Sequence, residues 1–179
     1  ANPTGPMHVG HARCAIYGDA LAGLLDYCGY KVTREFYVND FGNQISDLAK
    51  TVYLRYKANL LNEQVSIPQG LYPGEYLAPV AQHLVDAYQD QLLHMSEEQS
   101  MAIIKKIAVQ EMLKLIKEDL ADLGIKHDIF FHESYLHENK LIDSLVEELQ
   151  EKKLVYTGTL SAPKGQEYEE WQASERLIF

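Results

Sequence analysis

Apolar side chains recur at helical spacing along most of this chain. The spacing predicts a helix over residues 9–28 that stops at Gly29, and a second helix over residues 44–57. The side chains on the predicted inward faces are Ala12, Ile16, Ala20 and Leu24 in the first helix, and Ile45, Leu48, Val52 and Tyr56 in the second. Each helix therefore offers one apolar face to a core.

Three more helices are predicted further along the chain. Residues 77–93 form one, and Ser96 with Gln99 makes a capping box that starts another, which runs to Gly124. The inward side chains of this longer helix are Met101, Ile104, Ala108, Met112, Leu115 and Leu123. The last amphipathic helix is predicted over residues 139–152.

Short segments rich in β-branched and aromatic residues lie between the helices and predict strands. They cover residues 31–38, 127–132, 154–160 and 171–179. Strands that alternate with helices are typical of a parallel sheet, so the predicted fold class is α/β. A strand placed before residue 1 would complete a strand–loop–helix unit at the carboxyl edge of a doubly wound sheet, where such sheets bind nucleotides.

Composition narrows the class of protein. A chain of 179 residues with 46% hydrophobic side chains can bury one substantial core and part of another. Cys14 and Cys28 make neither a CxxC motif nor a disulfide framework, which favours a reducing, cytoplasmic location. No apolar run approaches the roughly 20 residues of a membrane-spanning helix, so we expect no membrane partner.

The formal charge of −10 is distributed unevenly. Residues 1–57 hold six Lys or Arg and five Asp or Glu, whereas residues 58–179 hold ten and twenty-one. Such an acidic surface argues against this chain providing the main grip on a nucleic acid. The sequence begins inside a motif without an initiator methionine and ends in an apolar run, so we expect it to be a piece of a longer protein.

The first eleven residues carry the clearest chemistry. Two prolines and Gly5 shape a loop that delivers His8 and His11 to one face at the start of the first predicted helix. A helix N-terminus binds phosphate, and imidazoles there can donate hydrogen bonds that stabilise charge developing at phosphorus. Gly10 removes a side chain from the first turn, so that a phosphate or a flat group can approach the backbone.

Other interpretations of the two histidines stay open at this point. They are also suited to capping the helix, or to lying on its surface without any ligand. A metal site is disfavoured, because two histidines without a third ligand nearby are an incomplete set.

Residues 8–11, His-Val-Gly-His, resemble the HIGH signature of class I aminoacyl-tRNA synthetases. The longer run over residues 1–11 is similar to the form found in arginyl-tRNA synthetases, especially the bacterial ones. Further segments that resemble this family are residues 29–40, 42–45, 72–77 and 149–158. The resemblance runs the whole length of the chain and is most specific in the first 45 residues.

The resemblance implies ATP-dependent activation of arginine to arginyl-adenylate and transfer to tRNA(Arg), with Mg²⁺ accompanying the ATP. His8 and His11 would then be catalytic residues that contact the ATP phosphates, and the adenine would lie on Gly10. Asn2 would hold the arginine substrate, since an amide can bind both a carboxylate and an ammonium group. From the residues alone, a turn or cap before Pro3 explains Asn2 equally well.

Asn39, Asp40 and Gln44 are weaker candidates for substrate binding. They follow a predicted strand, at the edge where open α/β sheets bind ligands. Turn formation and helix capping account for Asn39 and Asp40 just as well.

The resemblance also implies an organisation. Residues 1–134 would be the first half of a Rossmann-like (HUP-type) catalytic domain, a partial doubly wound parallel sheet with helical and small β insertions, and residues 135–179 would start the connective insertion. The family's KMSK-type loop, the residues that read the guanidinium and the anticodon-binding domain have no counterpart in this sequence. We therefore expect a monomeric longer ligase, and little or no activity from this chain alone.

Two rival functions stay open. Nucleotidyltransferases share the His-x-Gly-His helix start and similar phosphate chemistry, but they are usually compact single domains without long helices and an insertion. A non-catalytic, synthetase-like module that binds a partner is the second rival, and the acidic surface would allow it. A requirement for tRNA, and sensitivity of turnover to His8→Ala and His11→Ala, would separate these functions from the ligase.

Overall fold

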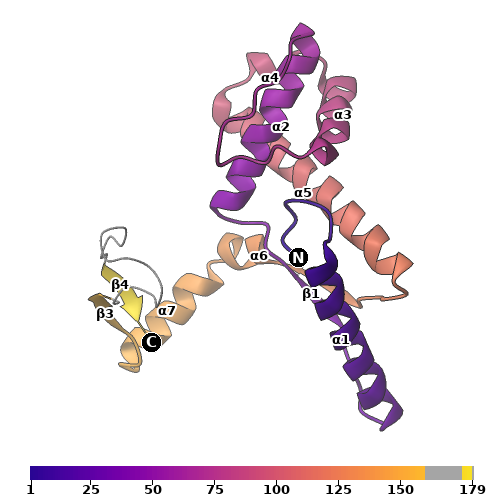
Figure 1. Cartoon of the computed structure of the whole chain (residues 1–179). Coiled ribbons are helices and arrows are strands. Elements are labelled where there is room, and N and C mark those ends of the chain that lie inside the picture. Colours follow the sequence, from indigo (N-terminus) through magenta and orange to yellow (C-terminus); the bar gives the residue numbers. More distant parts are fainter. Residues whose placement is uncertain (160–174, 179) are drawn as a thin grey trace. The chain divides into compact units, whose positions relative to one another are not determined.

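The computed structural model describes residues 1–159 and 175–178, and the chain divides into two compact units, Ala1–Ser134 and Tyr135–Phe179. Figure 1 labels most of their helices and strands. In the first unit the elements follow the order α1 (Val9–Tyr27), β1 (Glu35–Val38), α2 (Asn43–Leu61), η1 (Glu75–Leu77), α3 (Ala78–Tyr88), α4 (Gln91–His94), α5 (Glu97–Asp122) and β2 (Ile129–His132). The described residues are mostly helical, with a small parallel sheet.

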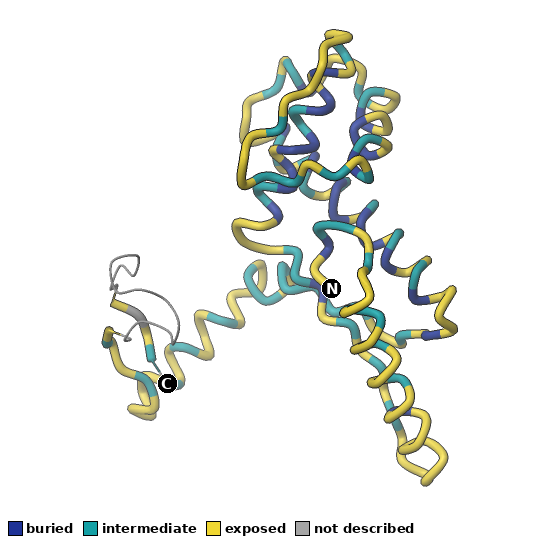
Figure 2. Tube along the Cα trace, viewed as in Figure 1, coloured by how far each residue is buried: buried dark blue, intermediate teal, exposed yellow. Residues whose placement is uncertain are grey.

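The main core of the first unit lies where α2, α3 and α5 pack together. Figure 2 shows buried positions concentrated along these helices. All four side chains predicted to face inward from α2 are buried, which confirms that expectation. On α5, Ile104, Ala108 and Met112 are buried as predicted, whereas Leu123, the C-cap residue just after the helix, is 43% exposed.

The predicted start of α5 is confirmed. The Ser96 hydroxyl oxygen accepts a hydrogen bond from Gln99 N at 3.3 Å, and Gln99 Oε1 accepts one from Ser96 N at 3.4 Å. The helix predicted over residues 77–93 is instead divided into η1, α3 and α4. It breaks at Gln89, which has a φ of +49° and whose carbonyl accepts a hydrogen bond from the buried Tyr56 hydroxyl.

The predicted inward face of α1 is wrong. Ile16 is 50% exposed and Leu24 is 65% exposed, whereas the buried residue of this helix is Ala22. Apolar side chains surround most of α1, so their spacing does not select a single face. Tertiary contacts select it instead, because Ala15 packs against the apolar cluster that contains Ile125.

Strands β1 and β2 pair in parallel, with Glu35 opposite Ile129 and Val38 opposite His132. This pairing confirms the parallel sheet predicted from the alternation of strands and helices. The inner face of the pair packs on α5, where Val38 joins Val109 in a cluster. Because the strands are parallel, both of their carboxyl ends lie at the same edge.

The second unit holds α7 (Leu141–Glu151), β3 (Tyr156–Thr159) and β4 (Glu175–Ile178), and α6 (Glu133–Glu138) spans the boundary between the units. Strands β3 and β4 pair in antiparallel fashion. The helix predicted over residues 139–152 corresponds to α7, whereas α6 was not predicted. The remaining parts of the two C-terminal strand predictions, residues 160–174 and 179, lie outside the described residues.

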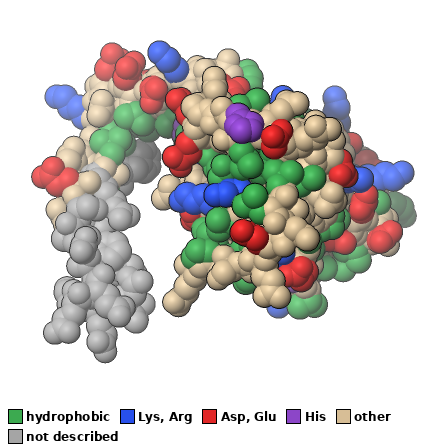
Figure 3. Space-filling view, turned by 90° about the horizontal axis from the view of Figure 1, so that it is seen from above, with side chains coloured by type: hydrophobic (Ala, Val, Ile, Leu, Met, Phe, Trp, Pro, Cys, Tyr) green, Lys and Arg blue, Asp and Glu red, His purple; other side chains and the backbone are tan. Residues whose placement is uncertain are grey.

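The surface carries hydrophobic, acidic and basic side chains. On the face shown in Figure 3, hydrophobic side chains gather between scattered acidic and basic ones. Within the part of the chain that the structure describes, no helix is both long enough and apolar enough to cross a membrane.

Candidate functional site

The opening loop, residues 1–8, is held against the first unit at several points. The carbonyl of Asn2 accepts a hydrogen bond from Thr4 N at 2.8 Å, which closes a tight turn around the fully buried Pro3. Further along, the amide of Met7 donates to Asp119 Oδ2 of α5 at 3.1 Å. These contacts fix the backbone that leads into α1.

The two histidines cap the helix that they start. His8 is the N-cap of α1, and its Nδ1 accepts a hydrogen bond from Gly10 N at 3.1 Å. In return, His8 N donates to His11 Nδ1 at 3.4 Å. The two rings stack with their centroids 3.6 Å apart. The capping role considered from the sequence is therefore confirmed.

This capping arrangement also sets the tautomers of the rings. Since both Nδ1 atoms act as acceptors, each neutral ring carries its proton on Nε2 and keeps one N–H donor for a ligand. Burial, followed by the neighbouring His8, lowers the pKa of His11 and so favours its neutral form. The dipole at the N-terminus of α1 adds a positive potential to the same place.

Both histidines line one cavity of about 640 Å³. A cavity of this volume is large enough for a small organic ligand. Across it, Asn2 Nδ2 donates a hydrogen bond to Gln44 Oε1 at 2.7 Å. The structure thus brings four residues selected from the sequence, Asn2, His8, His11 and Gln44, to one cavity. The other lining residues are Ala1, Thr4, Gly5, Pro6, Tyr72 and Tyr76.

Gly10 does not line this cavity. A Cβ atom at this position would lie 3.0 Å from His8 Cε1 and 3.1 Å from His8 Nδ1, closer than such contacts normally are. The absence of a side chain at Gly10 therefore serves the His8 ring, which folds back over the first turn to accept the Gly10 amide.

Asp40 lies at the shared carboxyl edge of β1 and β2 and does not line the cavity. Its carboxylate accepts hydrogen bonds from Ser134 N at 2.8 Å, from His132 Nδ1 at 2.7 Å and from the Ser134 hydroxyl at 2.9 Å. Burial alone would raise the pKa of Asp40, but these hydrogen bonds outweigh it and hold the pKa below its ordinary value. The carboxylate therefore joins the ends of the two strands.

Asn39 makes a similar link. In the orientation that satisfies both of its amide atoms, Asn39 Nδ2 donates to Glu133 Oε2 at 2.9 Å. Asn39 is also absent from the lining of the cavity that holds the histidines.

Tyr72 and Tyr76 also line the cavity, although the sequence alone favours packing over a recognition loop for residues 72–76. They flank a Pro-Gly-Glu turn within one of the segments that resemble the synthetase family. Two tyrosines around such a turn are a signal that could have identified them, but nothing local to the turn indicates that it packs on a loop some 70 residues earlier in the chain.

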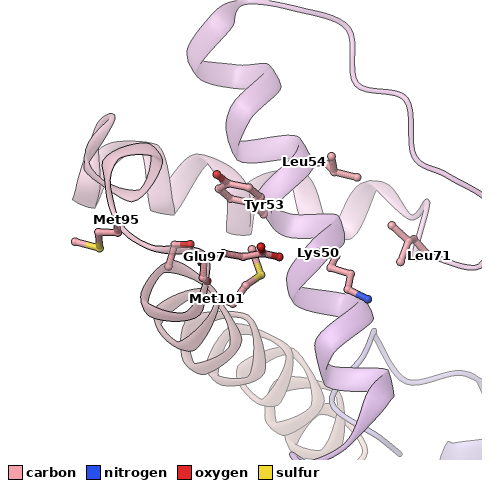
Figure 4. Close-up of a pocket in the computed structure, with 8 residues that line it drawn as sticks. Lys50, Tyr53, Leu54, Leu71, Met95, Glu97 and Met101 are labelled. Atoms are coloured by element: carbon pink, nitrogen blue, oxygen red, sulfur yellow. Dashed lines mark hydrogen bonds between the residues drawn. The ribbon is translucent and has the colours of Figure 1, made fainter.

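A second cavity, of about 440 Å³, lies between α2 and the start of α5 (Figure 4). Lys50 and Tyr53 reach it from α2, and Glu97 and Met101 from α5. None of the candidate site residues selected from the sequence lines it. Among the described residues, no group of three or more His, Cys, Asp or Glu could hold a metal ion.

Comparison with known proteins gives one consistent family. The family model for the catalytic domain of class I tRNA synthetases of the R type, "tRNA synthetases class I (R), catalytic domain", matches residues 1–159. The chain is 54% identical over 179 residues to an arginine–tRNA ligase of Orientia tsutsugamushi (strain Ikeda). It is 55% identical over the same length to an arginine–tRNA ligase of Rickettsia rickettsii (strain Sheila Smith).

These relatives are much longer than the chain. The alignments cover 100% of this chain but only 30% and 31% of the two ligases. Among solved structures, a proposed arginyl-tRNA synthetase from Campylobacter jejuni matches with a TM-score of 0.75 and 38% identity, over 87% of this chain and 34% of that one. The chain therefore spans about a third of the length of the proteins that it resembles.

Proposed function

The chain belongs to the catalytic-domain family of class I arginyl-tRNA synthetases, and from this premise we propose that it supplies the ATP-phosphate side of an arginine–tRNA ligase active site. The proposed reaction is ATP-dependent formation of arginyl-adenylate, followed by transfer of the arginyl group to tRNA(Arg). The observation that carries the proposal is the pair of stacked imidazoles at the N-terminus of α1, in the same cavity as Asn2.

In the first step a carboxylate oxygen of arginine attacks the α-phosphorus of ATP, and pyrophosphate leaves. His8 and His11 donate hydrogen bonds from Nε2 to phosphate oxygens, and the N-terminus of α1 adds its dipole. Charge that develops on those oxygens meets donors that are already in place, because the capping box fixes both rings before the ligand binds. Gly10 leaves room for the His8 ring in this arrangement, and the adenine of ATP lies beside Gly10 in this proposal.

Asn2 and Gln44 form the arginine side of the cavity in this proposal. Their mutual hydrogen bond uses one donor of Asn2 and one acceptor of Gln44. It leaves the side-chain oxygen Oδ1 of Asn2 to accept from an ammonium group and the side-chain nitrogen Nε2 of Gln44 to donate to a carboxylate. This set of free atoms suits the two charged groups of an amino acid.

Substrate binding by Asn39 and Asp40 stays a prediction. We propose that these two residues contribute to it from the carboxyl edge of the β1–β2 sheet. Their hydrogen bonds to the start of α6 and to β2 support a role in holding this edge together.

We further propose that residues 1–134 form the first half of a Rossmann-like (HUP-type) doubly wound sheet domain, and that residues 135–179 begin the connective insertion. The parallel pairing of β1 and β2 supports the first assignment. The proposed partners are arginine, ATP and tRNA(Arg), in a cytoplasmic, monomeric protein. Mg²⁺ would accompany the ATP phosphates in this proposal.

The test is exchange of pyrophosphate into ATP by a full-length protein that contains this chain. We expect exchange that requires both arginine and tRNA, and none when lysine replaces arginine. The chain alone should give little or no exchange, because it spans about 30% of the length of its relatives.

Three outcomes would contradict the proposal. Robust exchange by the chain alone would show that no further residues are needed. Absence of exchange from the full-length protein would exclude the ligase and favour a non-catalytic module. Pyrophosphate release with a phosphorylated small-molecule acceptor and without tRNA would favour a nucleotidyltransferase.

A further inference from the structure

A buried arginine on α2 donates hydrogen bonds to the loop that precedes η1 and α3. Arg55 is 5% exposed, and its Nη2 donates to the carbonyl oxygens of Pro73 at 2.8 Å and Gly74 at 3.2 Å. The same nitrogen lies 3.1 Å from Glu75 Oε1. Because a buried cation is costly without such partners, the arginine and these backbone oxygens hold each other in place.

A second contact from α2 holds the same loop. Tyr72 N donates to the hydroxyl of Thr51 at 3.2 Å, and Thr51 is fully buried. Residues 72–75 are therefore fixed to the most buried helix of the first unit.

Tyr76, the next residue along the chain, connects this fixed loop to the opening loop. The Tyr76 hydroxyl donates to the carbonyl of Thr4 at 2.9 Å. Its ring lies so close to two glycines that a Cβ atom would come within 2.1 Å of it at Gly74 and within 3.0 Å of its hydroxyl at Gly5. A tyrosine hydroxyl is protonated, and so a donor, at neutral pH, and burial raises the pKa of this one further.

Thr4 lies between Asn2 and His8, and all three line the same cavity together with Tyr76. We propose that Tyr76, held by Arg55 through residues 73–75, is a positioning residue that sets the opening loop and thereby the distance between the amino-acid side and the phosphate side of the site. This inference rests on the proposed function for its kinetic consequence. The loop geometry itself does not depend on that function.

The test uses Tyr76→Phe in a full-length protein that contains this chain, because this change keeps the ring and removes only the hydroxyl. Removing one hydrogen bond at the loop should lower kcat/KM for arginine and for ATP by about three- to tenfold in pyrophosphate exchange. The KM for tRNA should not change. Amide hydrogen exchange over residues 2–12 should become faster, with or without substrates.

The matched control is Tyr56→Phe, which also removes a tyrosine hydroxyl that donates to a backbone carbonyl, here that of Gln89, and neither residue lines the cavity. It should lower the Tm and leave both the kinetic constants and the rate of amide hydrogen exchange over residues 2–12 unchanged. The inference is overturned if Tyr76→Phe leaves amide hydrogen exchange over residues 2–12 unchanged. It is also overturned if the kcat/KM values of Tyr76→Phe match those of Tyr56→Phe. Lack of activity in the parent protein would count against the proposed function alone, since the amide exchange still decides the role of Tyr76.

Discussion

Each histidine of the opening loop uses its two ring nitrogens for different purposes. The Nδ1 atoms accept backbone N–H groups at the start of α1, and this leaves the Nε2 N–H groups as ligand donors. A spacing of three residues predicts that His8 and His11 share a face, but it does not predict their stacking or their tautomers. Those details follow from the extended backbone of His8, with φ −116° and ψ 171°, which turns its ring over the first helical turn.

This arrangement gives His11 a predictable pH dependence. Its Nδ1 can accept from His8 N only when the ring is neutral, and burial lowers its pKa below the ordinary value of 6.5. The folded state therefore binds a proton less readily than the unfolded state, so stability from this group is present above pH 6.5 and is lost as pH falls through the lowered pKa.

An NMR titration of the His11 ring proton should give a pKa below 6.5, and His11→Gln should remove the corresponding part of the pH dependence of unfolding. Titration of His11 above 6.5 would mean that its ring is not held as a neutral acceptor.

Side-chain hydrogen bonds hold the carboxyl ends of β1 and β2 together, in addition to the backbone pairing of two short strands. Both strands have four residues, and Asp40 joins their ends through His132 and Ser134. Local sequence predicts the two strands, but the partner of Asp40 lies more than ninety residues away along the chain. No local pattern reveals such a contact, so turn formation and ligand binding were equally good explanations of Asp40.

We expect Asp40→Asn to destabilise the protein by about 1–3 kcal/mol at neutral pH, because it weakens charge-assisted hydrogen bonds to a half-buried edge. The lowered pKa of Asp40 means that this stability is present above its unfolded value of 3.8 and is lost as pH falls through the folded value. Urea unfolding measures the difference. The exposed Asp26→Asn is the matched control, and an equal effect of the two changes would disprove the role of Asp40.

The capping box of α5 is a second element-scale test. Ser96→Ala removes the acceptor for Gln99 N and should cost about 1 kcal/mol of unfolding free energy. Ser66→Ala, in the exposed loop before η1, should change it by less than about 0.5 kcal/mol. Equal effects of the two variants would show that the cap contributes nothing to stability.

Helices with one apolar stripe were predictable, and helices without one were not. The inward side chains of α2 were identified because polar residues occupy its other face, whereas α1 is apolar around most of its circumference and its buried face was assigned wrongly. Likewise, element order predicts the parallel pairing, while the break at Gln89 coincides with a tertiary hydrogen bond from Tyr56 that no local pattern indicates.

At the scale of the whole molecule, charge does not explain how the site would attract ATP. The chain carries a formal charge of −10, so its long-range field repels a polyanion. Within this chain the favourable potential is therefore local, at the N-terminus of α1 and at the two imidazoles, where screening by salt matters little once the ligand is bound. Arginine as the substrate rests on the family resemblance, since no Asp or Glu is among the described residues that line the cavity.

The central claim is that the two imidazoles at the start of α1 stabilise charge on the ATP phosphates. The most direct measurement is arginine-dependent pyrophosphate exchange by a full-length protein that contains His8→Ser or His11→Ala. His8→Ser keeps an oxygen that can cap the helix, so it separates the imidazole from the cap. His83→Ala, whose ring pairs with Glu111 outside the cavity, is the matched control.

We predict that each change at His8 or His11 lowers the exchange rate by about 10²- to 10³-fold, as expected for loss of one preorganised donor, with less than a twofold change for His83→Ala. Exchange by His8→Ser and His11→Ala at the rate of the His83→Ala control would contradict the account.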